Sequence, residues 1–252
     1  MSKKAALVTG SAIRLGKAIA IALAKDGYDI ALHYNSSASA AEETKAEIQS
    51  LGVQCEAFQL NLRKADDMPD FVKDVVIRFP HLSVLVNSAS AYTQATIENT
   101  TTAIFDQQFD VNIKAPFFLT QIFANTVSKG NVINIIDNKM AFNQNNYAAY
   151  LLAKKTLVSF TKMAAIEYAP SVRVNGLAPG VVLPAGTRSP EYMEWRIQGI
   201  PLKMQGTTQH ITDGILSLLQ NTFVTGQILT VDGGESITNT GKNAGDFDQS
   251  KI

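Results

Sequence analysis

The sequence predicts a single-domain α/β fold in which a parallel sheet of about seven strands is flanked by helices on both faces. Short runs rich in Val, Ile and Leu recur along the chain, and they are continuous rather than alternating, which is typical of strands buried on both faces. Longer segments with apolar residues at helical spacing lie between these runs. A doubly wound sheet with right-handed crossovers requires this alternation of strand and helix.

The predicted strands follow one another at regular intervals along the chain. They are Ala5–Thr9, Asp29–Tyr34, Gln54–Leu60, Val84–Asn87, Val132–Ile136, Val172–Leu177 and Ile228–Val231. The first intervening helix carries an apolar stripe at Leu15, Ile19 and Leu23. The pattern therefore predicts one Rossmann-type domain over residues 1–238, followed by a polar tail over residues 239–252.

A long segment, Thr187–Gly199, separates the sixth strand from the next clear helix. Long functional loops in this type of fold lie over the carboxyl ends of the strands, where ligands bind. The segment is interpreted as part of a substrate lid at around residues 184–206, with Leu183, Met193 and Trp195 as candidate substrate contacts. A simple packed helix is the alternative.

Composition excludes several classes of function. Lys and Arg equal Asp and Glu at 22 each, so the summed charge does not favour nucleic acid or a membrane surface as a partner. Cys55 is the only cysteine, which excludes an internal disulfide, and we expect it in a buried strand. The start lacks the ~7–15 apolar residues of a signal peptide, and no run reaches the ~18 residues of a membrane span. These features predict a cytoplasmic protein, and the spacing of His and Cys predicts no metal site.

The turn after the first strand, Thr9–Gly16, leads directly into a helix. Gly10 and Gly16 allow the backbone to approach a pyrophosphate, whose charge is stabilised by the N–H groups at the helix N-terminus. Ile13 and Arg14 occupy the region where the usual dinucleotide fingerprint has a third glycine. The turn therefore predicts a dinucleotide site mainly through its position between strand and helix.

The end of the second strand indicates which dinucleotide is bound. An Asp or Glu that would bind a ribose 2′-hydroxyl is missing there. The residues present are His33, Tyr34, Asn35, Ser36 and Ser37. Because Arg14 can bind a 2′-phosphate through a charge-assisted fork and the serines can supply hydroxyl donors, we predict NADP(H) as the cofactor. A solvated helix residue is the alternative for Arg14.

Tyr150 and Lys154 are four residues apart in a strongly helical segment, so they project from the same helix face. A neighbouring ammonium favours the phenolate of a tyrosine, whose ordinary pKa is about 10, and so suits it to acid–base chemistry. The preceding strand ends at Asp137. These residues are candidate catalytic groups.

The sequence resembles the short-chain dehydrogenase/reductase family from Lys4 to about Ile237. The segments that carry the resemblance are Thr9–Gly16, Asn87–Ala89, Asn112, Tyr150 with Lys154, Pro179–Gly180 and Val231–Gly234. It implies that Tyr150 protonates the substrate, that Lys154 binds the nicotinamide ribose and lowers the pKa of the tyrosine, and that Asn112 holds a water in the proton path. It also implies a homotetramer.

Asp137 distinguishes this chain from most of that family, which has a serine about a dozen residues before the tyrosine. An ionised carboxylate cannot donate to a carbonyl oxygen, but it can accept from ring N–H groups or, when protonated, pass a proton to a ring nitrogen. The pteridine reductase branch looks like this, with Asp for Ser and an arginine in the glycine turn. This resemblance implies a pterin substrate, with Ser90 bound to cofactor or pterin and Tyr92 stacked on the pterin ring.

The remaining candidate residues complete the expected site. Further cofactor contacts are expected from Leu15, Asn61, Leu62, Asn87, Ser88, Ala89, Pro179 and Gly180. Arg14 is expected to contact the substrate as well as the cofactor. Two alternatives stay open: a carbonyl or 3-oxoacyl thioester reductase that uses the same Tyr150 and Lys154, and a catalytically silent NADP-binding scaffold.

Overall fold

The computed structural model describes residues 3–183 and 189–238 of the 252-residue chain. Residues 184–188 of the predicted lid and the predicted tail, 239–252, lie outside the described residues. The strands are β1 (Lys4–Val8), β2 (Tyr28–Tyr34), β3 (Cys55–Gln59), β4 (Leu82–Asn87), β5 (Gly130–Ile135), β6 (Val172–Pro179) and β7 (Ile228–Val231). The α-helices are α1 (Arg14–Lys25), α2 (Ala38–Gln49), α3 (Met68–Arg78), α4 (Thr102–Phe109), α5 (Ala115–Thr126), α6 (Ala148–Glu167), α7 (Pro190–Ile197) and α8 (Thr208–Gln220).

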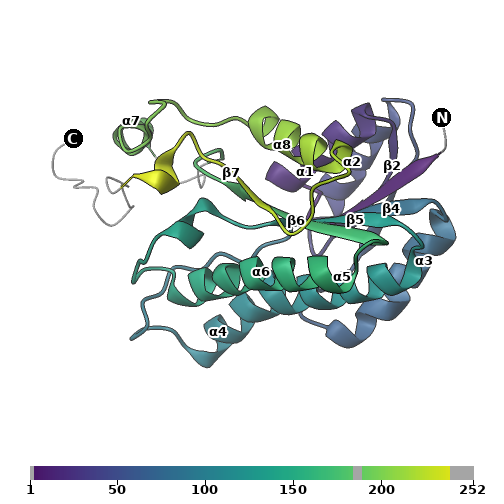
Figure 1. The fold of residues 1–252 in the computed structure, drawn as a ribbon, viewed down its shortest axis with the longest axis horizontal. Helices are drawn as coiled ribbons and strands as arrows, with labels where there is room; N and C mark the ends of the chain where they lie inside the picture. Colours follow the sequence, from purple (N-terminus) through teal and green to yellow (C-terminus); the bar gives the residue numbers. More distant parts are fainter. Residues whose placement is uncertain (1–2, 184–188, 239–252) are drawn as a thin grey trace.

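The strands form one seven-stranded sheet in the order β3-β2-β1-β4-β5-β6-β7, and every neighbouring pair is parallel. Helices α1, α2 and α8 cover one face, and α3, α5 and α6 cover the other (Figure 1). The predicted doubly wound fold is thereby confirmed, and each predicted strand is present with its ends within two residues of the predicted ones.

Strand β1 explains why the predicted strands have continuous apolar runs. Ala5 and Leu7 belong to the hydrophobic core under α3 and α5, whereas Ala6 and Val8 belong to the core under α1 and α8. All four side chains are fully buried. Because alternate side chains point to opposite faces and helices cover both faces, the four positions after Lys4 all take apolar residues.

Local sequence signals define the start of α8 and the end of α1. At the start of α8, the Thr207 hydroxyl accepts from the His210 N–H, and the His210 ring accepts from the Thr207 N–H at 3.1 Å, which forms a capping box. After α1 the chain turns at Gly27, whose φ of +83° is readily accessible only to glycine. These two ends depend on residues close in sequence.

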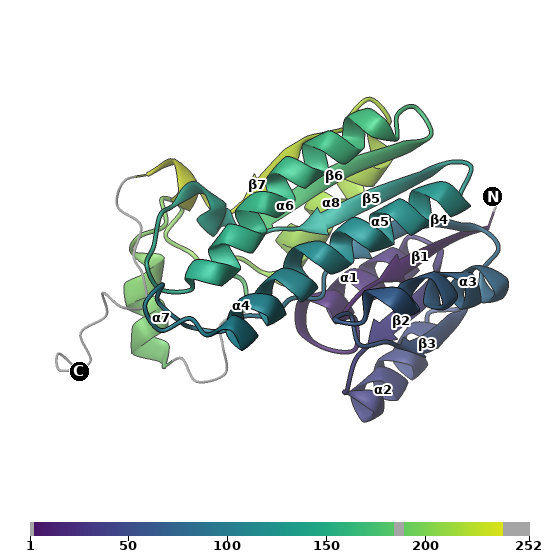
Figure 2. The ribbon, with the colours of Figure 1, turned by 90° about the horizontal axis from the view of Figure 1, so that it is seen from below.

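The order of the sheet reverses between β1 and β4, which is where a doubly wound sheet binds its ligand. The Thr9 hydroxyl accepts from the backbone N–H groups of Ser88 and Ala89 at 2.9 and 3.0 Å, so it joins the two loops that leave these strands. Helix α7 lies at the end of the molecule opposite the N-terminus (Figure 2). The elements that could form a site therefore gather at the carboxyl edge of the sheet.

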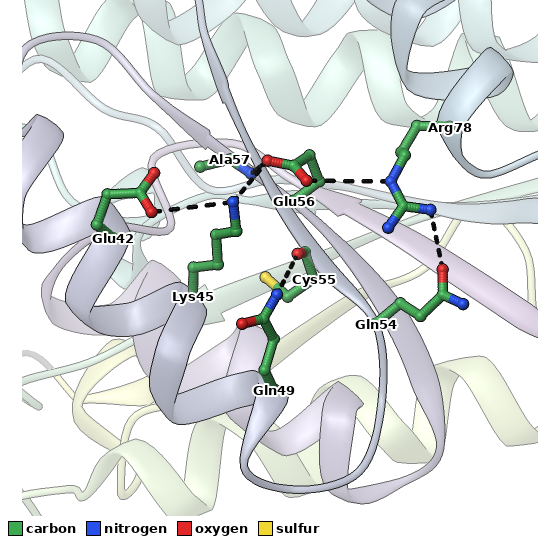
Figure 3. A network of polar contacts seen from close by, with 8 residues as sticks. All are labelled: Glu42, Lys45, Gln49, Gln54, Cys55, Glu56, Ala57 and Arg78. Carbon is green, nitrogen blue, oxygen red and sulfur yellow. Dashed lines mark hydrogen bonds and ion pairs between the residues drawn. The ribbon is translucent and has the colours of Figure 1, made fainter.

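A polar network covers the outer edge of the sheet at β3 (Figure 3). Lys45 of α2 forms an ion pair with Glu56 of β3 at 2.7 Å. Glu42 lies 3.8 Å from the Lys45 ammonium, and Arg78 lies 4.0 Å from the Glu56 carboxylate. Cys55 beside it is buried, as predicted, and burial raises the pKa of its thiol to about 12. In the described part of the chain, no helix is both long and apolar enough to cross a bilayer.

Candidate active site

A cavity of about 870 Å³ opens at the carboxyl edge of the sheet, and loops that follow most of the strands line it. It receives most of the residues predicted from the sequence. Those that line it are Gly10, Arg14, Leu15, Gly16, His33, Tyr34, Asn35, Ser36, Ser37, Asn61, Leu62, Ser88, Ala89, Ser90, Tyr92, Asp137, Tyr150, Lys154, Pro179, Gly180, Leu183 and Met193. Asn87, Asn112 and Trp195 are the predicted residues that do not line it.

The glycine turn packs too closely to admit other side chains. A Cβ atom on Gly16 would lie 2.2 Å from the carbonyl oxygen of Gly10, and one on Gly10 would lie 2.9 Å from the Cα of Ala89. Gly10 also has a φ of +65°. The close packing fixes the path of the turn into α1, and the N–H groups of the first turn of that helix can bind a phosphate.

Arg14 is the first residue of α1 and has a φ of +55°. A non-glycine residue in this region costs about 1–2 kcal/mol, and such strain is concentrated at functional sites. Its Nη2 donates to the carbonyl oxygen of Leu183 at 3.0 Å, across the mouth of the cavity. The arginine side chain is exposed, and its hydrogen bond connects the glycine turn to Leu183, which precedes α7 in the chain.

The loop after β2 provides a second anion-binding surface. Ser36 and Ser37 line the cavity and precede α2, and Ser37 is its N-cap without a side-chain capping bond. The N–H groups of the first turn of a helix attract an anion. Among the residues that the structure describes, no Asp or Glu belongs to this part of the wall and would repel a phosphate.

His33 lines the cavity and also contacts the glycine turn. It is buried, its Nδ1 accepts from the Gly10 N–H at 3.0 Å, and its Nε2 lies 3.0 Å from the carbonyl oxygen of Leu60. Burial lowers its pKa to about 4, against the opposing effect of the Leu60 carbonyl, so the ring is neutral at pH 7. The hydrogen bond between the Gly10 N–H and the buried His33 ring thus holds the glycine turn in place.

A short hydrogen bond joins Tyr150 and Asp137 on the cavity wall. The Tyr150 hydroxyl donates to Asp137 Oδ2 at 2.7 Å, while Asp137 Oδ1 accepts from the Lys139 N–H at 2.8 Å. Burial, followed by the charge of Asp137 and this hydrogen bond, raises the pKa of Tyr150 well above 10. The expected lowering of this pKa is therefore wrong, because burial and the neighbouring carboxylate both raise it.

Lys154 lies one helical turn after Tyr150 and is also buried. Its Nζ donates to the carbonyl oxygen of Ile135 at 2.8 Å and lies 5.8 Å from the centre of the Tyr150 ring. Burial lowers its pKa to about 8, although Asp137 opposes the shift. At pH 7 this ammonium is charged and fixed at the end of β5.

Aromatic rings line the wall beside Tyr150. Tyr92 stacks on Tyr147 with ring centres 4.4 Å apart, and it meets the Tyr150 ring edge-on at 4.8 Å. Sequence reasoning missed Tyr147, which is the N-cap of α6 and has a φ of +64°. Its only sequence signal is its position three residues before Tyr150. One face of Tyr92 is thus covered by protein rather than open to a ligand.

Asn112 is buried beneath this wall, within a π-helical turn, Asp110–Lys114, that joins α4 to α5. Its Oδ1 accepts from the Ser90 hydroxyl at 2.8 Å, and its Nδ2 donates to the Ala91 carbonyl at 2.9 Å and to Gln108 at 3.3 Å. The side chain therefore fixes the loop that carries Ser90. Such π-helical turns often occur at functional sites.

Asn87 also lies in the interior rather than on the cavity wall. Its Nδ2 donates to Asn134 Oδ1 at 2.8 Å, between neighbouring strands β4 and β5. This bond aligns the carboxyl ends of the two strands from which Ser88 and Asp137 emerge. The predicted contact of Asn87 with the cofactor stays a prediction.

Helix α7 closes the remaining side of the cavity. Tyr192, Met193 and Arg196 line the wall, and Trp195 instead packs against Tyr192. Arg196 is buried and paired with the buried Glu235, a pair that sequence reasoning missed because its partners are distant in the chain. Within residues 3–183 and 189–238, no group of three His, Cys, Asp or Glu could hold a metal ion.

The chain is similar to several known proteins along most of its length. The family described as enoyl-(acyl carrier protein) reductase matches residues 10–236. The 3-oxoacyl-acyl-carrier-protein reductase FabG of Staphylococcus epidermidis is 31% identical over 239 residues, which cover 92% of this chain and 98% of that protein.

Two solved structures have a similar fold. FolM alternative dihydrofolate reductase 1 from Brucella suis, solved in complex with NADP, superposes with a TM-score of 0.88 at 30% identity and covers 93% of this chain and 95% of its own. The acetoin dehydrogenase YohF from Salmonella typhimurium has a TM-score of 0.85 at 29% identity, with 94% and 99% covered.

Proposed function

We propose that this chain, which belongs to the short-chain dehydrogenase/reductase family, is an NADPH-dependent reductase of a pterin ring, such as a dihydropteridine or a dihydrofolate. The chain is an oxidoreductase of that family, and the pterin substrate is the step beyond it. The observation that carries the proposal is the 2.7 Å hydrogen bond from the Tyr150 hydroxyl to Asp137 on the cavity wall. A phenol and a carboxylate side by side can exchange protons with two nitrogen atoms of one heterocycle.

The cavity fits an extended dinucleotide. The glycine turn has a tight backbone that a Cβ on Gly16 would disrupt, and Ser36 and Ser37 lie at the N-terminus of α2 on the same wall. Lys154 is at the opposite end, where a nicotinamide ribose would lie. When bound, NADPH supplies the hydride that reduces the substrate.

The choice of NADP(H) over NAD(H) rests on charge. Arg14 and the two serines surround the position expected for a 2′-phosphate, and no carboxylate lines the wall there. A guanidinium binds a phosphate more strongly than a ribose hydroxyl because its hydrogen bonds are charge-assisted. The FolM structure solved with NADP supports this choice.

Tyr150 acts as the proton donor in this proposal. Its raised pKa keeps the phenol protonated at pH 7, so the proton is present before the reaction begins. The charged Lys154, held by the Ile135 carbonyl, stabilises the phenolate that forms when the proton leaves. The low polarity of the surroundings strengthens this attraction.

Asp137 gives the site its preference for a nitrogen heterocycle. A carboxylate next to a ketone oxygen is repulsive, whereas next to ring N–H groups it is an acceptor. Tyr92 would contact the flat ring with the face that Tyr147 leaves open, and Ser90, which lines the cavity, would donate or accept at the ring edge. FolM's description as a dihydrofolate reductase supports a role in folate metabolism.

The alternative function is reduction of a 3-oxoacyl thioester or another ketone. The similarity to FabG across 98% of that protein favours it. It would use the same Tyr150 and Lys154, but an ionised Asp137 would face the ketone oxygen with no proton to donate. A silent NADP-binding scaffold is disfavoured by the buried Tyr150 and Lys154, because burial of an ammonium beside a phenol costs free energy that a scaffold has no reason to spend.

We further propose that several copies, in a homotetramer, assemble in the cytoplasm. Apolar side chains on the outer surfaces of α5 and α6 support self-association: Phe117, Met163 and Ile166 are 42%, 68% and 82% exposed. Exposed apolar side chains on neighbouring helices are typical of interfaces between subunits.

NADPH oxidation by the protein and its Asp137→Ala and Asp137→Ser variants tests the proposal. The panel contains quinonoid, dihydro and oxidised pterins, dihydrofolate, an acetoacetyl thioester and simple ketones. We expect the pterins to be reduced, Asp137→Ala to lose roughly 100-fold or more of that turnover, and its affinity for NADPH to stay unchanged. Equal turnover of dihydropterin by Asp137→Ala, or a preference of the unaltered protein for the thioester, would sink the pterin assignment.

A further inference from the structure

A buried polar chain connects three distant segments around the cavity. Asn138 Nδ2 donates to Glu235 Oε2 at 2.9 Å, and the other carboxylate oxygen of Glu235 pairs with Nη2 of Arg196. Asn138 directly follows Asp137, Arg196 belongs to α7, and Glu235 begins the short helix Glu235–Ile237 after β7. We call Asn138, Glu235 and Arg196 the lid network.

The lid network is shielded from solvent. Asn138, Arg196 and Glu235 are only 2%, 3% and 1% exposed. Removing an ion pair from water costs stability that mutual attraction often fails to recover, so an apolar pair of similar size would anchor α7 at least as well. Arg196 also keeps one buried donor, Nη1, without a hydrogen-bond partner in the described part of the chain. Stability alone therefore does not account for this pair.

The position of Arg196 on α7 indicates which side chains the Arg196–Glu235 pair holds in place. Tyr192 and Met193 precede it by one helical turn, so all three project from the same side of the helix, and all three line the cavity. The geometry of Arg196 on Glu235 therefore determines how far Tyr192 and Met193 reach into the cavity.

The other end of the network reaches the catalytic segment. Asp137 caps the short helix Asn138–Ala141, and the next side chain, Asn138, is fixed by Glu235 and, at 3.3 Å, by Asp232. Asp232 itself accepts from the Gly234 and Ser236 N–H groups at 2.9 and 2.7 Å, which makes the Glu235 segment rigid. Glu235 thus contacts both the segment with the proposed proton-transfer group and the helix over the substrate.

We propose that the lid network positions the substrate. Glu235 fixes Arg196 and Asn138 relative to each other, so that the α7 side chains and Asp137 contact the same ligand. Arg196, Glu235 and Asn138 are positioning residues, because they act through Tyr192, Met193 and Asp137. The inference rests on the proposed reductase function for its substrate, but not for its geometry.

The test replaces the ion pair as a unit. In the paired variant Arg196→Met with Glu235→Met, no buried charge is left unpaired, so we expect a Tm within about 4 °C of the unaltered protein. The KM for the reduced substrate should rise roughly tenfold or more, because displacement of the contacts costs binding of the correctly placed ligand. The Kd for NADPH should change less than about twofold, since none of its proposed contacts is altered.

Trp195 offers a readout that does not depend on activity. It is the only tryptophan of the chain and lies on α7 beside Arg196. Acrylamide should quench its fluorescence about twofold more strongly in the paired variant, because α7 is held less firmly. The substitution Asn138→Leu should instead lower kcat roughly tenfold and leave the quenching unchanged, since it disconnects only the Asp137 side.

A remote ion pair provides the control. His81 and Asp29 are 2.9 Å apart and belong to no part of the cavity wall, so the paired variant His81→Gln with Asp29→Asn should keep both the KM and the Trp195 quenching. If the Met–Met variant does not fold, the pair Arg196→Gln with Glu235→Gln, which keeps polar contacts, carries the same test.

The outcomes separate the two proposals. Unaltered KM and unaltered Trp195 quenching in a folded paired variant would overturn the lid network as a positioning device. Absence of pterin turnover in the unaltered protein would instead count against the proposed function, and the quenching comparison would still test the network.

Discussion

The two ends of the cavity are built from different kinds of contact. At the glycine turn, side chains hold main-chain groups: the Thr9 hydroxyl binds the N–H groups of Ser88 and Ala89, and the His33 ring binds the Gly10 N–H. Around α7 and Tyr150, side chains hold one another, as in Tyr150 with Asp137 and Arg196 with Glu235.

This difference explains how proteins of one fold can act on different substrates. A phosphate surface made of backbone N–H groups needs small residues and a fixed turn, and few substitutions alter its chemistry. A wall made of side chains changes its chemistry with a single substitution. The similar proteins described as a 3-oxoacyl reductase, a dihydrofolate reductase and an acetoin dehydrogenase are consistent with this division.

The sharpest test of the comparison is Tyr150→Phe, which removes one hydroxyl from the substrate end. We expect kcat to fall roughly 100-fold to 10,000-fold, because the proposed proton donor is lost. The Kd for NADPH, measured by fluorescence titration, should not change. A matching loss of NADPH affinity would mean that the two ends are not independent.

The cofactor end should respond to acid through His33. Its pKa is about 4 in the folded protein and about 6.5 when unfolded. Between these values the unfolded state binds the extra proton, so stability is fully present above pH 6.5 and falls as the pH drops towards 4. The loss should reach about 3 kcal/mol, from a pKa difference worth ~1.4 kcal/mol per pH unit.

Urea unfolding of the protein and of His33→Gln at pH 7 and pH 4.5 measures this contribution. The glutamine oxygen can accept from the Gly10 N–H but does not titrate, so the variant should lose less stability in acid. Parallel losses in both proteins would show that His33 is not the titrating group.

Gly16→Ala should weaken the cofactor end without changing its chemistry. The added Cβ would lie 2.2 Å from the Gly10 carbonyl oxygen, so the backbone must shift. We expect NADPH affinity to fall roughly tenfold, because the N–H groups that bind phosphate move with the turn. Gly52→Ala is the matched control: its φ of +86° makes alanine strained, but the position is open and far from the cavity. It should lower Tm and leave NADPH affinity unchanged.

The smallest effect is expected at the β3 edge network of Figure 3, where the ion pair is partly solvated. Lys45 and Glu56 have 20% and 36% of their side-chain surface exposed, compared with 3% and 1% for Arg196 and Glu235. Glu56→Gln should change the free energy of unfolding by less than about 1 kcal/mol and leave kcat unchanged. Chemical unfolding and NADPH oxidation measure both, and a lowered kcat would contradict the view that only the buried pair affects the site.

The sequence by itself determined the parts of this protein that depend on local pattern. Buried strands need apolar residues on both faces, which made β1 to β7 visible, and Tyr150 and Lys154 share a helix face through their spacing alone. The glycine turn and the missing acid after β2 could also be recognised from the sequence, because their effects come from the residues present at those positions.

Tertiary structure decided the contacts between residues far apart in the chain. The burial of His33 behind Gly10, the Tyr92–Tyr147 stack and the Arg196–Glu235 pair all depend on which segments meet at the carboxyl edge of the sheet. The direction of the Tyr150 pKa shift also depended on tertiary structure. Burial and the distance to Asp137 set this direction, and the sequence spacing of Tyr150 and Lys154 specifies neither. A residue's chemistry is therefore set by its neighbours in space, which a single sequence does not specify.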